Sequence, residues 1–225
     1  MITITTVHGA HLRISRAPAV TPIVFVVDAD ISVRQSLALL IRAFGWRHET
    51  FASAQEFLAR PRTSVPSCLI LNVTLPDLNG LELQRRVAAD RSDMPIIFIT
   101  EYADVRMSVQ AMKAGAIEFL TKPFDDDVMV SAIGQALERS RRALEREAKM
   151  QGLRQSYASL TPREREVMML VAAGLLNKQV GGELGISEIT VKAHRGQVMR
   201  KMKAESLPAL VNMAASLGVS SAAAW

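Results

Sequence analysis

Short strand-like segments that alternate with amphipathic helical segments constrain the fold of this chain more than any other feature. Most of these segments are continuously apolar and too short for helices, which indicates strands buried on both faces of a sheet. Strands separated by helices in this way predict a doubly wound α/β domain with a parallel sheet. The five predicted strands are Ile23–Val27, Glu49–Phe51, Cys68–Leu71, Ile96–Ile99 and Glu118–Thr121.

Polar side chains stand where four of these strands end. Asp28, Asn72 and Thr100 directly follow apolar runs, and Lys122 follows the last predicted strand. The carboxyl ends of parallel strands share one edge of the sheet, where α/β domains bind their ligands, so we expect one polar cluster. An enzyme that uses Asp28, Thr100 and Lys122 on a phosphorylated substrate is an alternative. It is disfavoured because no general base or nucleophile accompanies the cluster.

A strongly basic helix is predicted from Ser187 to about Lys203. Val191, Val198 and Met202 recur at helical spacing and form an apolar stripe, and the segment carries five basic residues against one acidic residue. A helix with an apolar back and a cationic front suits the major groove of double-stranded DNA. A solvated basic face on an ordinary surface helix is the alternative for such a helix in isolation.

The residues before the basic helix form a pattern of short helices. Thr161 and Glu164 have the spacing of a helix N-cap and a capping-box acid. Asn177 is predicted to cap a short helix at Lys178–Leu184, and Gly185 turns the chain into the basic helix. Two helices joined by a tight glycine turn, the second one basic, indicate a helix-turn-helix motif.

Residues 157–219 resemble the LuxR-type DNA-binding domain, a four-helix module, through the motifs TPREREV, LGIS and TVK. The resemblance implies that Lys192 reads base edges in the major groove. Lys178 and Lys201 lie at the edges of that face, so each is expected to contact a phosphate. The positions assigned to DNA binding in this way are Lys178, Thr190, Lys192, Ala193, His194, Arg195, Gly196 and Lys201.

Two glycines in the short helix depart from the LuxR-type pattern. The family usually has alanine and a longer residue where this chain has Gly181 and Gly182. Glycine loses more conformational freedom on folding than other residues, so each is expected to cost about 1 kcal/mol of helix stability relative to alanine. The two glycines therefore predict a DNA-binding module of lower stability that still binds DNA.

Residues 22–125 resemble the receiver domain of two-component response regulators, which has a flavodoxin-like topology. The resemblance implies a pocket for a phosphoryl group and a metal ion at the carboxyl edge of the sheet, together with an aromatic residue that switches position. The corresponding pocket positions here are Asp28, Ala29, Asp30, Asn72, Thr100, Glu101 and Lys122, and the switch aromatic is Phe119.

This receiver-like domain lacks two of the family's acids. Asn72 stands at the position of the phosphoacceptor aspartate, and an acyl phosphate requires a carboxylate nucleophile rather than a neutral carboxamide. Ala29 stands at the position of the second metal-binding acid, with Asp30 beside it, so we expect weak or absent magnesium binding and no other cofactor. Glu101 is expected to cover the pocket or to pair with Lys122. The double departure favours a naturally degenerate receiver over one engineered substitution.

A long helix is predicted between the two domains, at residues 126–156. Its apolar residues form an intermittent seam, which is sparse for a coiled coil. A dimer contact along this seam is nevertheless expected, because little else would bury it. The seam consists of Ile133, Leu137, Leu144, Ala148 and Leu153.

The order of a receiver-like domain (22–125), a linker helix (126–156) and a LuxR-type domain (157–219) resembles the NarL/FixJ class of transcriptional regulators. The flanking residues are predicted to form a flexible arm (1–21) and a tail (220–225). We expect a DNA-binding regulator that is a homodimer without aspartyl phosphorylation. A regulator whose pocket senses a ligand or a protein partner is the alternative.

Composition argues against several other classes of protein. The formal net charge is +5 and Cys68 is the only cysteine, so a disulfide framework is excluded. No apolar run approaches the roughly 20 residues of a membrane span, and we expect a cytoplasmic protein. His8 and His11 have no third ligand near them in the sequence, so no metal site is predicted. The absence of aromatic residues between Tyr157 and Trp225 disfavours single-stranded RNA as a partner.

Overall fold

The structure is a computed structural model that describes residues 21–102 and 104–219. The chain forms two compact units, the first of which ends at Arg141, within a long helix. The predictions for the N-terminal arm, for His8 and His11, and for the C-terminal tail concern residues outside those that the structure describes.

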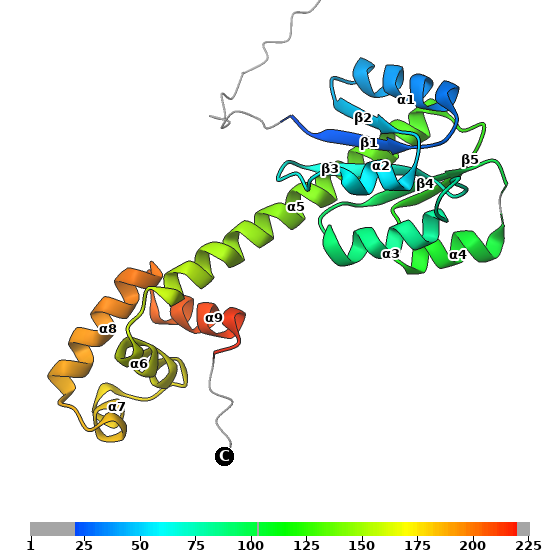
Figure 1. The fold of residues 1–225 in the computed structure, drawn as a ribbon. Coiled ribbons are helices and arrows are strands. Elements are labelled where there is room, and N and C mark those ends of the chain that lie inside the picture. Colours follow the sequence, from blue (N-terminus) through cyan, green and yellow to red (C-terminus); the bar gives the residue numbers. More distant parts are fainter. Residues whose placement is uncertain (1–20, 103, 220–225) are drawn as a thin grey trace, which may run out of the picture. The chain divides into compact units, whose positions relative to one another are not determined.

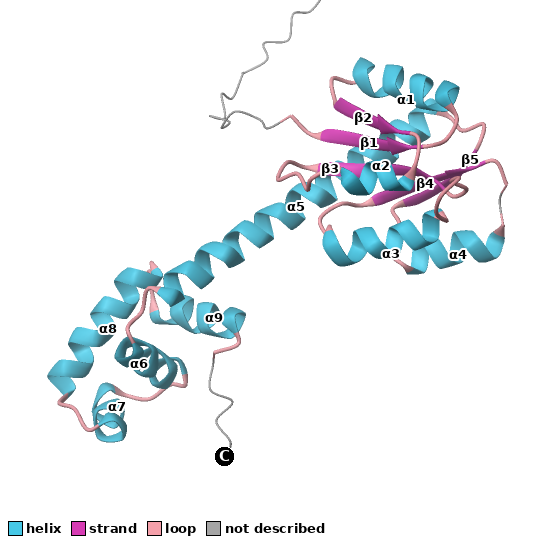
Figure 2. Cartoon of the chain, viewed as in Figure 1, coloured by secondary structure: helices cyan, strands magenta, loops and turns pink. Residues whose placement is uncertain are grey.

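The first unit is a parallel sheet with helices between its strands (Figures 1 and 2). The strand order is β2-β1-β3-β4-β5, and every neighbouring pair is parallel, which confirms the predicted doubly wound fold. The elements are β1 (Ile23–Val27), α1 (Ile31–Ala43), β2 (Arg47–Phe51), α2 (Ala54–Ala59), β3 (Ser67–Asn72), α3 (Gly80–Asp90), β4 (Ile96–Thr100), α4 (Val105–Lys113), β5 (Glu118–Thr121) and α5 (Asp126–Ala158), which continues into the second unit.

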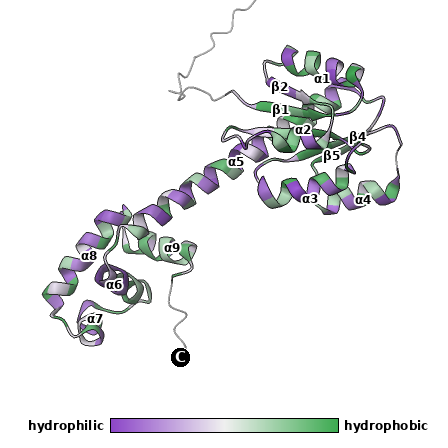
Figure 3. Cartoon of the chain, in the orientation of Figure 1, coloured by the Kyte–Doolittle hydropathy of each residue, from purple (hydrophilic) through white to green (hydrophobic). Residues whose placement is uncertain are grey.

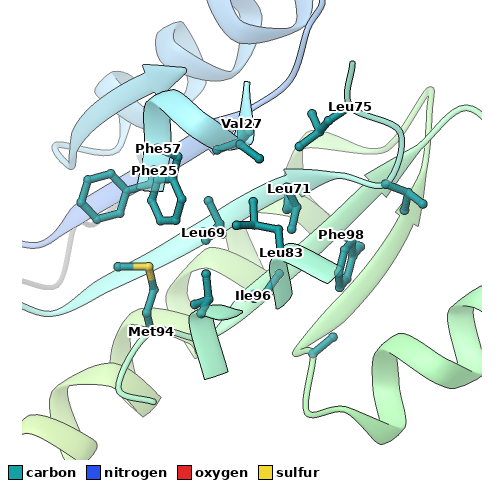
Figure 4. Packing of buried hydrophobic residues seen from close by; sticks show 14 of the residues in the cluster. Phe25, Val27, Phe57, Leu69, Leu71, Leu75, Leu83, Met94, Ile96 and Phe98 are labelled. Carbon is teal, nitrogen blue, oxygen red and sulfur yellow. The ribbon is translucent and has the colours of Figure 1, made fainter. Parts of the chain in front are cut away.

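Alternation of side chains along the strands divides the core of this unit into two layers. Phe25 and Val27 of β1 pack with α2, α3 and α4 on one face of the sheet. Val24 and Val26 pack with α1 and α5 on the other face. Figure 4 shows the first layer, in which the rings of Phe25 and Phe57 meet at an angle of 63° with centroids 5.7 Å apart. Both faces of the sheet are therefore covered, and its carboxyl edge lies between the two packed layers.

The apolar seam predicted along α5 is divided between two cores. Ile133 and Leu137 are buried in the first unit, and Leu153 packs against the core of the second. Leu144 and Ala148 lie outside these cores, in the middle of α5, where hydrophilic residues predominate (Figure 3). The prediction that the seam has little else to bury it was therefore wrong, because each end of the helix belongs to a folded unit.

The second unit is helical, and its helices share one apolar core that includes Val171, Val191 and Leu210. This arrangement confirms the predicted four-helix module. The Thr161 and Glu164 capping box is present. Within the residues that the structure describes, no helix is both long and apolar enough to cross a membrane. The four helices after α5 are α6 (Pro162–Ala172), α7 (Asn177–Leu184), α8 (Glu188–Met202) and α9 (Leu207–Leu217).

The two glycines of α7 have different surroundings. A Cβ atom on Gly181 would lie 2.7 Å from the carbonyl oxygen of Ile186, so the turn after α7 packs directly against the glycine backbone. A Cβ atom on Gly182 would meet nothing within 4 Å. The prediction that both glycines simply weaken α7 was therefore wrong for Gly181, because the missing side chain lets the turn close.

Alanine at these two positions should change stability in opposite directions. Gly182→Ala should raise the free energy of unfolding by about 1 kcal/mol, because alanine restricts the unfolded chain and meets no neighbour. Gly181→Ala should lower it, because the turn at Ile186 must move. Thermal unfolding of the two full-length variants, followed by circular dichroism, measures both signs. A loss of stability in Gly182→Ala would contradict this account of α7.

Candidate functional site

Asp28, Asn72 and Lys122 meet at the carboxyl edge of the sheet in the first unit. The Asp28 carboxylate is buried, and its Oδ2 atom lies 2.7 Å from the Lys122 ammonium nitrogen. Its Oδ1 atom accepts hydrogen bonds from Asn72 Nδ2 at 3.1 Å and from the Asp30 backbone N–H at 3.0 Å. One buried carboxylate is thus neutralised by one ammonium group, and its other oxygen is hydrogen-bonded by neutral groups.

The residues beside Asp28 have other partners. Asp30 caps α1, where its Oδ1 atom accepts hydrogen bonds from the Ser32 backbone N–H at 2.8 Å and hydroxyl at 2.5 Å. These bonds from Ser32 hold the pKa of the Asp30 carboxyl below its ordinary value. The Arg34 guanidinium, which was not predicted to belong to the site, binds the carbonyl oxygens of Asp28 and Ala29 at 2.7 and 2.8 Å. In residues 21–102 and 104–219, no group of three or more His, Cys, Asp or Glu side chains could hold a metal ion.

The remaining predicted pocket residues lie on or beside β4 and β5. The buried Thr100 hydroxyl accepts from the Tyr102 backbone N–H at 3.3 Å and donates to its carbonyl oxygen at 3.2 Å. Glu101 is exposed, and the Lys122 ammonium binds Asp28. In the described part of the chain, the predicted ion pair between Glu101 and Lys122 is therefore not formed. Phe119 is partly buried and packs against the core layer that contains Phe25.

In the second unit, α8 has a buried back and an exposed front. Val191, Val198 and Met202 lie in the core, as the sequence predicts. The predicted cap at Ser187 is also present, because its Oγ atom accepts from the Thr190 backbone N–H at 3.1 Å. The predicted DNA-binding residues that are exposed are Lys178 on α7 and Lys192, Ala193 and Gly196 on α8, whereas Thr190, His194, Arg195 and Lys201 are half-buried.

Three of the cations predicted to bind DNA have partners within this unit, and two of them are Arg195 and Lys192. Arg195 Nη1 donates to Asn177 Oδ1 at 3.1 Å, which joins α8 to α7. The Lys192 ammonium nitrogen lies 3.2 Å from the Glu188 carboxylate, and both side chains are exposed. The prediction that Asn177 caps α7 was wrong, because Leu176 is the N-cap residue and the Asn177 side chain binds Arg195.

Lys201 joins α8 to the start of α6. Its ammonium nitrogen lies 2.6 Å from Glu164 Oε2 and 3.3 Å from the Ser159 carbonyl oxygen. The hydrogen bond from Lys201 holds the pKa of the buried Glu164 carboxyl below its ordinary value. Lys201 therefore stabilises the helical packing, and its phosphate contact stays a prediction that competes with this ion pair.

The residue that the sequence reasoning missed on α8 is Ile189. Its side chain is 80 % exposed in the first turn of the helix. The available signal was its place in the helical repeat, because Ile189 lies on the side opposite the buried Val191 and Val198. Ile189 carries no charge, so the charge pattern of the helix does not indicate it.

Comparisons with known proteins match both units. The family model of the response regulator receiver domain matches residues 24–134. The family model of the bacterial regulatory proteins of the luxR family matches residues 158–214. Together the two models cover more than half of the chain.

Several relatives match this chain over most of the length of both proteins. The chain is 48 % identical over 198 residues to Nodulation protein W of Bradyrhizobium diazoefficiens, covering 88 % of this chain and 87 % of that protein. It is 41 % identical over 197 residues to the transcriptional regulatory protein FixJ of the same organism, covering 87 % and 96 %. The solved structure of the response regulator StyR matches with a TM-score of 0.78 and 46 % identity, covering 87 % of this chain and 99 % of that one. This chain therefore belongs to the NarL/FixJ-type response regulators, which are DNA-binding transcription factors, not enzymes, with a receiver domain and a LuxR-type helix-turn-helix domain.

Proposed function

We propose that this regulator binds its DNA sites without control by aspartyl phosphorylation. The observation that carries the proposal is Asn72, which ends β3 beside Asp28 and Lys122, where a receiver's acceptor aspartate would stand. A carboxamide is a poor nucleophile, so it forms no acyl phosphate. The amide instead donates a hydrogen bond to Asp28, a role that an ionised aspartate could not fill.

Magnesium binding is also disfavoured at this edge of the sheet. A magnesium ion needs several hard oxygen ligands, and Ala29 supplies no side-chain oxygen. Asp30 is engaged as the cap of α1, and the Asp28 carboxylate is paired with Lys122. A metal ion would have to compete with that ammonium group for the one buried carboxylate, which supports a pocket that is inert to phosphodonors.

We further propose that α8 enters the major groove of DNA. Its front carries exposed Lys192, while Ser187 fixes its first turn and the core residues fix its back. Lys192 is the residue proposed to read base edges, and the exposed Lys178 on α7 is proposed to contact the phosphate backbone.

Alanine at these two lysines should have different consequences. Lys192→Ala should weaken binding to the preferred site by about 1–3 kcal/mol and relax the preference for it, because a base contact is lost. Lys178→Ala should weaken binding to all sequences alike and reduce the salt slope by about one unit, because a phosphate contact is lost. Fluorescence anisotropy on preferred and random duplexes at several salt concentrations distinguishes the two. Equal loss on both duplexes for Lys192→Ala would show that α8 docks differently.

We propose that a second copy of this chain covers α4. Val105, Val109 and Met112 are spaced four and three residues apart on one side of the helix and are 76 %, 46 % and 44 % exposed. They are large apolar side chains in a row, which a monomeric protein rarely leaves in water. This stripe replaces the seam of α5 as the proposed dimer contact.

Exposed charges of both signs on the first unit support a symmetric contact of this kind. Arg106 and Lys113 lie beside the apolar stripe and line the same shallow groove. The run Asp125–Asp127 is exposed at the start of α5. A two-fold axis makes one surface face its own copy, so basic and acidic groups of the same unit can pair across it. We therefore infer a dimer that forms through the receiver domain without a phosphoryl group.

A further inference from the structure

The exposed front of α8 carries small and apolar residues along most of its length, and a cation stands only near its C-terminal end. Positions 189, 193, 196 and 200 recur at helical spacing, and they lie on the side opposite the residues buried in the core. Lys192 stands to one side of this row and forms an ion pair with Glu188. The front row, from the N-terminal end of the helix, consists of Ile189, Ala193, Gly196 and Arg200.

Ile189 is the most exposed large apolar side chain that the structure shows in the second unit, at 80 %. β-branched residues are poorer helix formers than alanine, so local structure gives no reason for isoleucine here. A cation stands beside it, because the exposed Lys192 follows three residues later on the same helix, and Lys178 and Arg200 are exposed elsewhere in the same unit. An apolar side chain among cations matches the DNA major groove, where the thymine methyl group is the apolar feature between two rows of phosphates.

Gly196 supplies an independent observation on the same row. It lies in the middle of α8, where glycine weakens a helix relative to alanine. A Cβ atom on Gly196 would meet nothing within 4 Å, so no neighbour in the described part of the chain requires its absence. A partner whose surface comes close to the helix backbone would require it.

We propose that Ile189 is a specificity-determining residue that contacts the 5-methyl group of a thymine in each half-site. In this arrangement Gly196 allows the middle of α8 to approach the DNA closely enough for the contact to form. The inference rests on the proposed docking of α8 in the major groove. It adds a preference for a methyl-bearing base at one position, which a lysine contact does not provide.

Uracil substitution tests the methyl contact, because uracil differs from thymine only by the missing methyl group. The full-length protein selects its preferred duplex from a random library, and each thymine of that duplex is then replaced by uracil in turn. One thymine per half-site should show an affinity loss of about fourfold, the value of one buried methyl group. Ile189→Ala should show a similar loss on the thymine duplex and should no longer respond to uracil at that position.

Leu176→Ala is the matched control, because Leu176 is also a large apolar residue of this unit and is 70 % exposed, but it lies outside α8. This variant should keep the response to uracil. A response that survives in Ile189→Ala, or the lack of any response in the unmodified protein, would overturn the methyl contact. A change in sedimentation of Ile189→Ala without a change in DNA preference would assign the side chain to a protein contact instead.

Gly196→Ala tests the close approach separately from folding. The variant should unfold at a higher temperature, because alanine favours the helix, and yet should lose affinity for the selected duplex. Gly152→Ala is the control, since Gly152 is an exposed glycine of α5 whose Cβ would also meet nothing within 4 Å. It should gain stability with unchanged affinity. Unchanged affinity in Gly196→Ala would overturn the close approach.

Lys192→Ala separates failure of this inference from failure of the proposed docking. Suppose that Lys192→Ala relaxes the sequence preference while Ile189→Ala leaves the uracil response intact. The docking of α8 would then stand, and only the role of Ile189 would be wrong. If neither variant changes the preference and no uracil position matters, α8 does not lie in the groove, and both proposals fail.

Discussion

The unmodified protein should incorporate no label from radiolabelled acetyl phosphate in the presence of magnesium, whereas the double variant Asn72→Asp with Ala29→Asp should become labelled. The double variant regains a carboxylate nucleophile at the end of β3 and a second acid for the metal ion. Label retained on the denatured protein, and released by hydroxylamine, measures the acyl phosphate. Because an amide has no corresponding chemistry, this difference is the largest that we expect.

Asn72→Asp alone should restore little labelling. The new carboxylate would stand at hydrogen-bond distance from buried Asp28, where Asn72 Nδ2 now donates at 3.1 Å. Two carboxylates about 4 Å apart repel by roughly 4 kcal/mol at an effective dielectric constant of about 20. Lys122 can neutralise one of them, but the metal ion needed for the other lacks a ligand at Ala29. The single variant should therefore also be less stable than the unmodified protein.

Asn79→Asp with Ala29→Asp is the matched control for this experiment. Asn79 is exposed and caps α3, and aspartate caps helices equally well, so the variant should fold normally. It should stay unlabelled, because its new carboxylate is not the one that ends β3. If the unmodified protein acquired a label that hydroxylamine releases, the proposal that this receiver is independent of phosphorylation would be wrong.

A fragment of residues 142–225 should bind a palindromic site about 10²–10⁴ times more weakly than the full-length protein. In a dimer the second half-site contact is intramolecular, and the effective concentration of the second module supplies this factor. The fragment begins at Arg142 because Leu153 and Tyr157 belong to the core of the second unit and must be kept. Titration of one palindromic duplex with both proteins measures the ratio.

Val109→Glu in the full-length protein should reproduce most of this loss. The substitution places a charge in the middle of the exposed stripe of α4, so the protein should sediment as a monomer at micromolar concentration, while the unmodified protein sediments as a dimer. Leu39→Glu is the control, because Leu39 is 66 % exposed on α1, outside the stripe. It should leave a dimer.

Two results would contradict the proposed dimer. If the fragment of residues 142–225 bound as tightly as the whole chain, the receiver would not hold the two modules together. If the unmodified protein sedimented as a monomer and dimerised only with an added ligand or protein, the pocket-sensing alternative would replace the standing dimer. Neither result would affect the expected outcome of the labelling experiment, because labelling depends on Asn72 and Ala29 alone.

The sequence by itself determined the two folds and the residues at the edge of the sheet. Continuous apolar runs specify strands buried on both faces, and the end of each run specifies which residue stands at the carboxyl edge, so Asp28 and Asn72 could be placed without coordinates. Helix caps such as Thr161 and Ser187 are local features, which the sequence also specifies. These features depend only on neighbouring residues and on periodicity.

The tertiary structure decided which distant groups bind each other. Nothing in the sequence pairs Lys201 with Glu164, or Arg195 with Asn177, and both pairs change the role expected of a cation on α8. The same holds for Gly181, whose missing side chain matters because the carbonyl of Ile186 lies against it. Periodicity assigns a residue to a face of a helix, but the partner at that face depends on how the helices pack.

The apolar residues of α5 and α8 show the same division between sequence and structure. Ile133 and Leu153 read as one seam in the sequence, yet Ile133 is buried in the first core and Leu153 packs against the second, since a helix can supply each end to a different unit. Ile189 reads as an ordinary member of an amphipathic helix, yet it is left exposed because the core residues fix the rotation of α8 about its axis. Burial is a property of the whole packed unit, so only the tertiary structure could assign Ile133 and Leu153 to separate cores, whereas the helical repeat already placed Ile189 opposite Val191 and Val198.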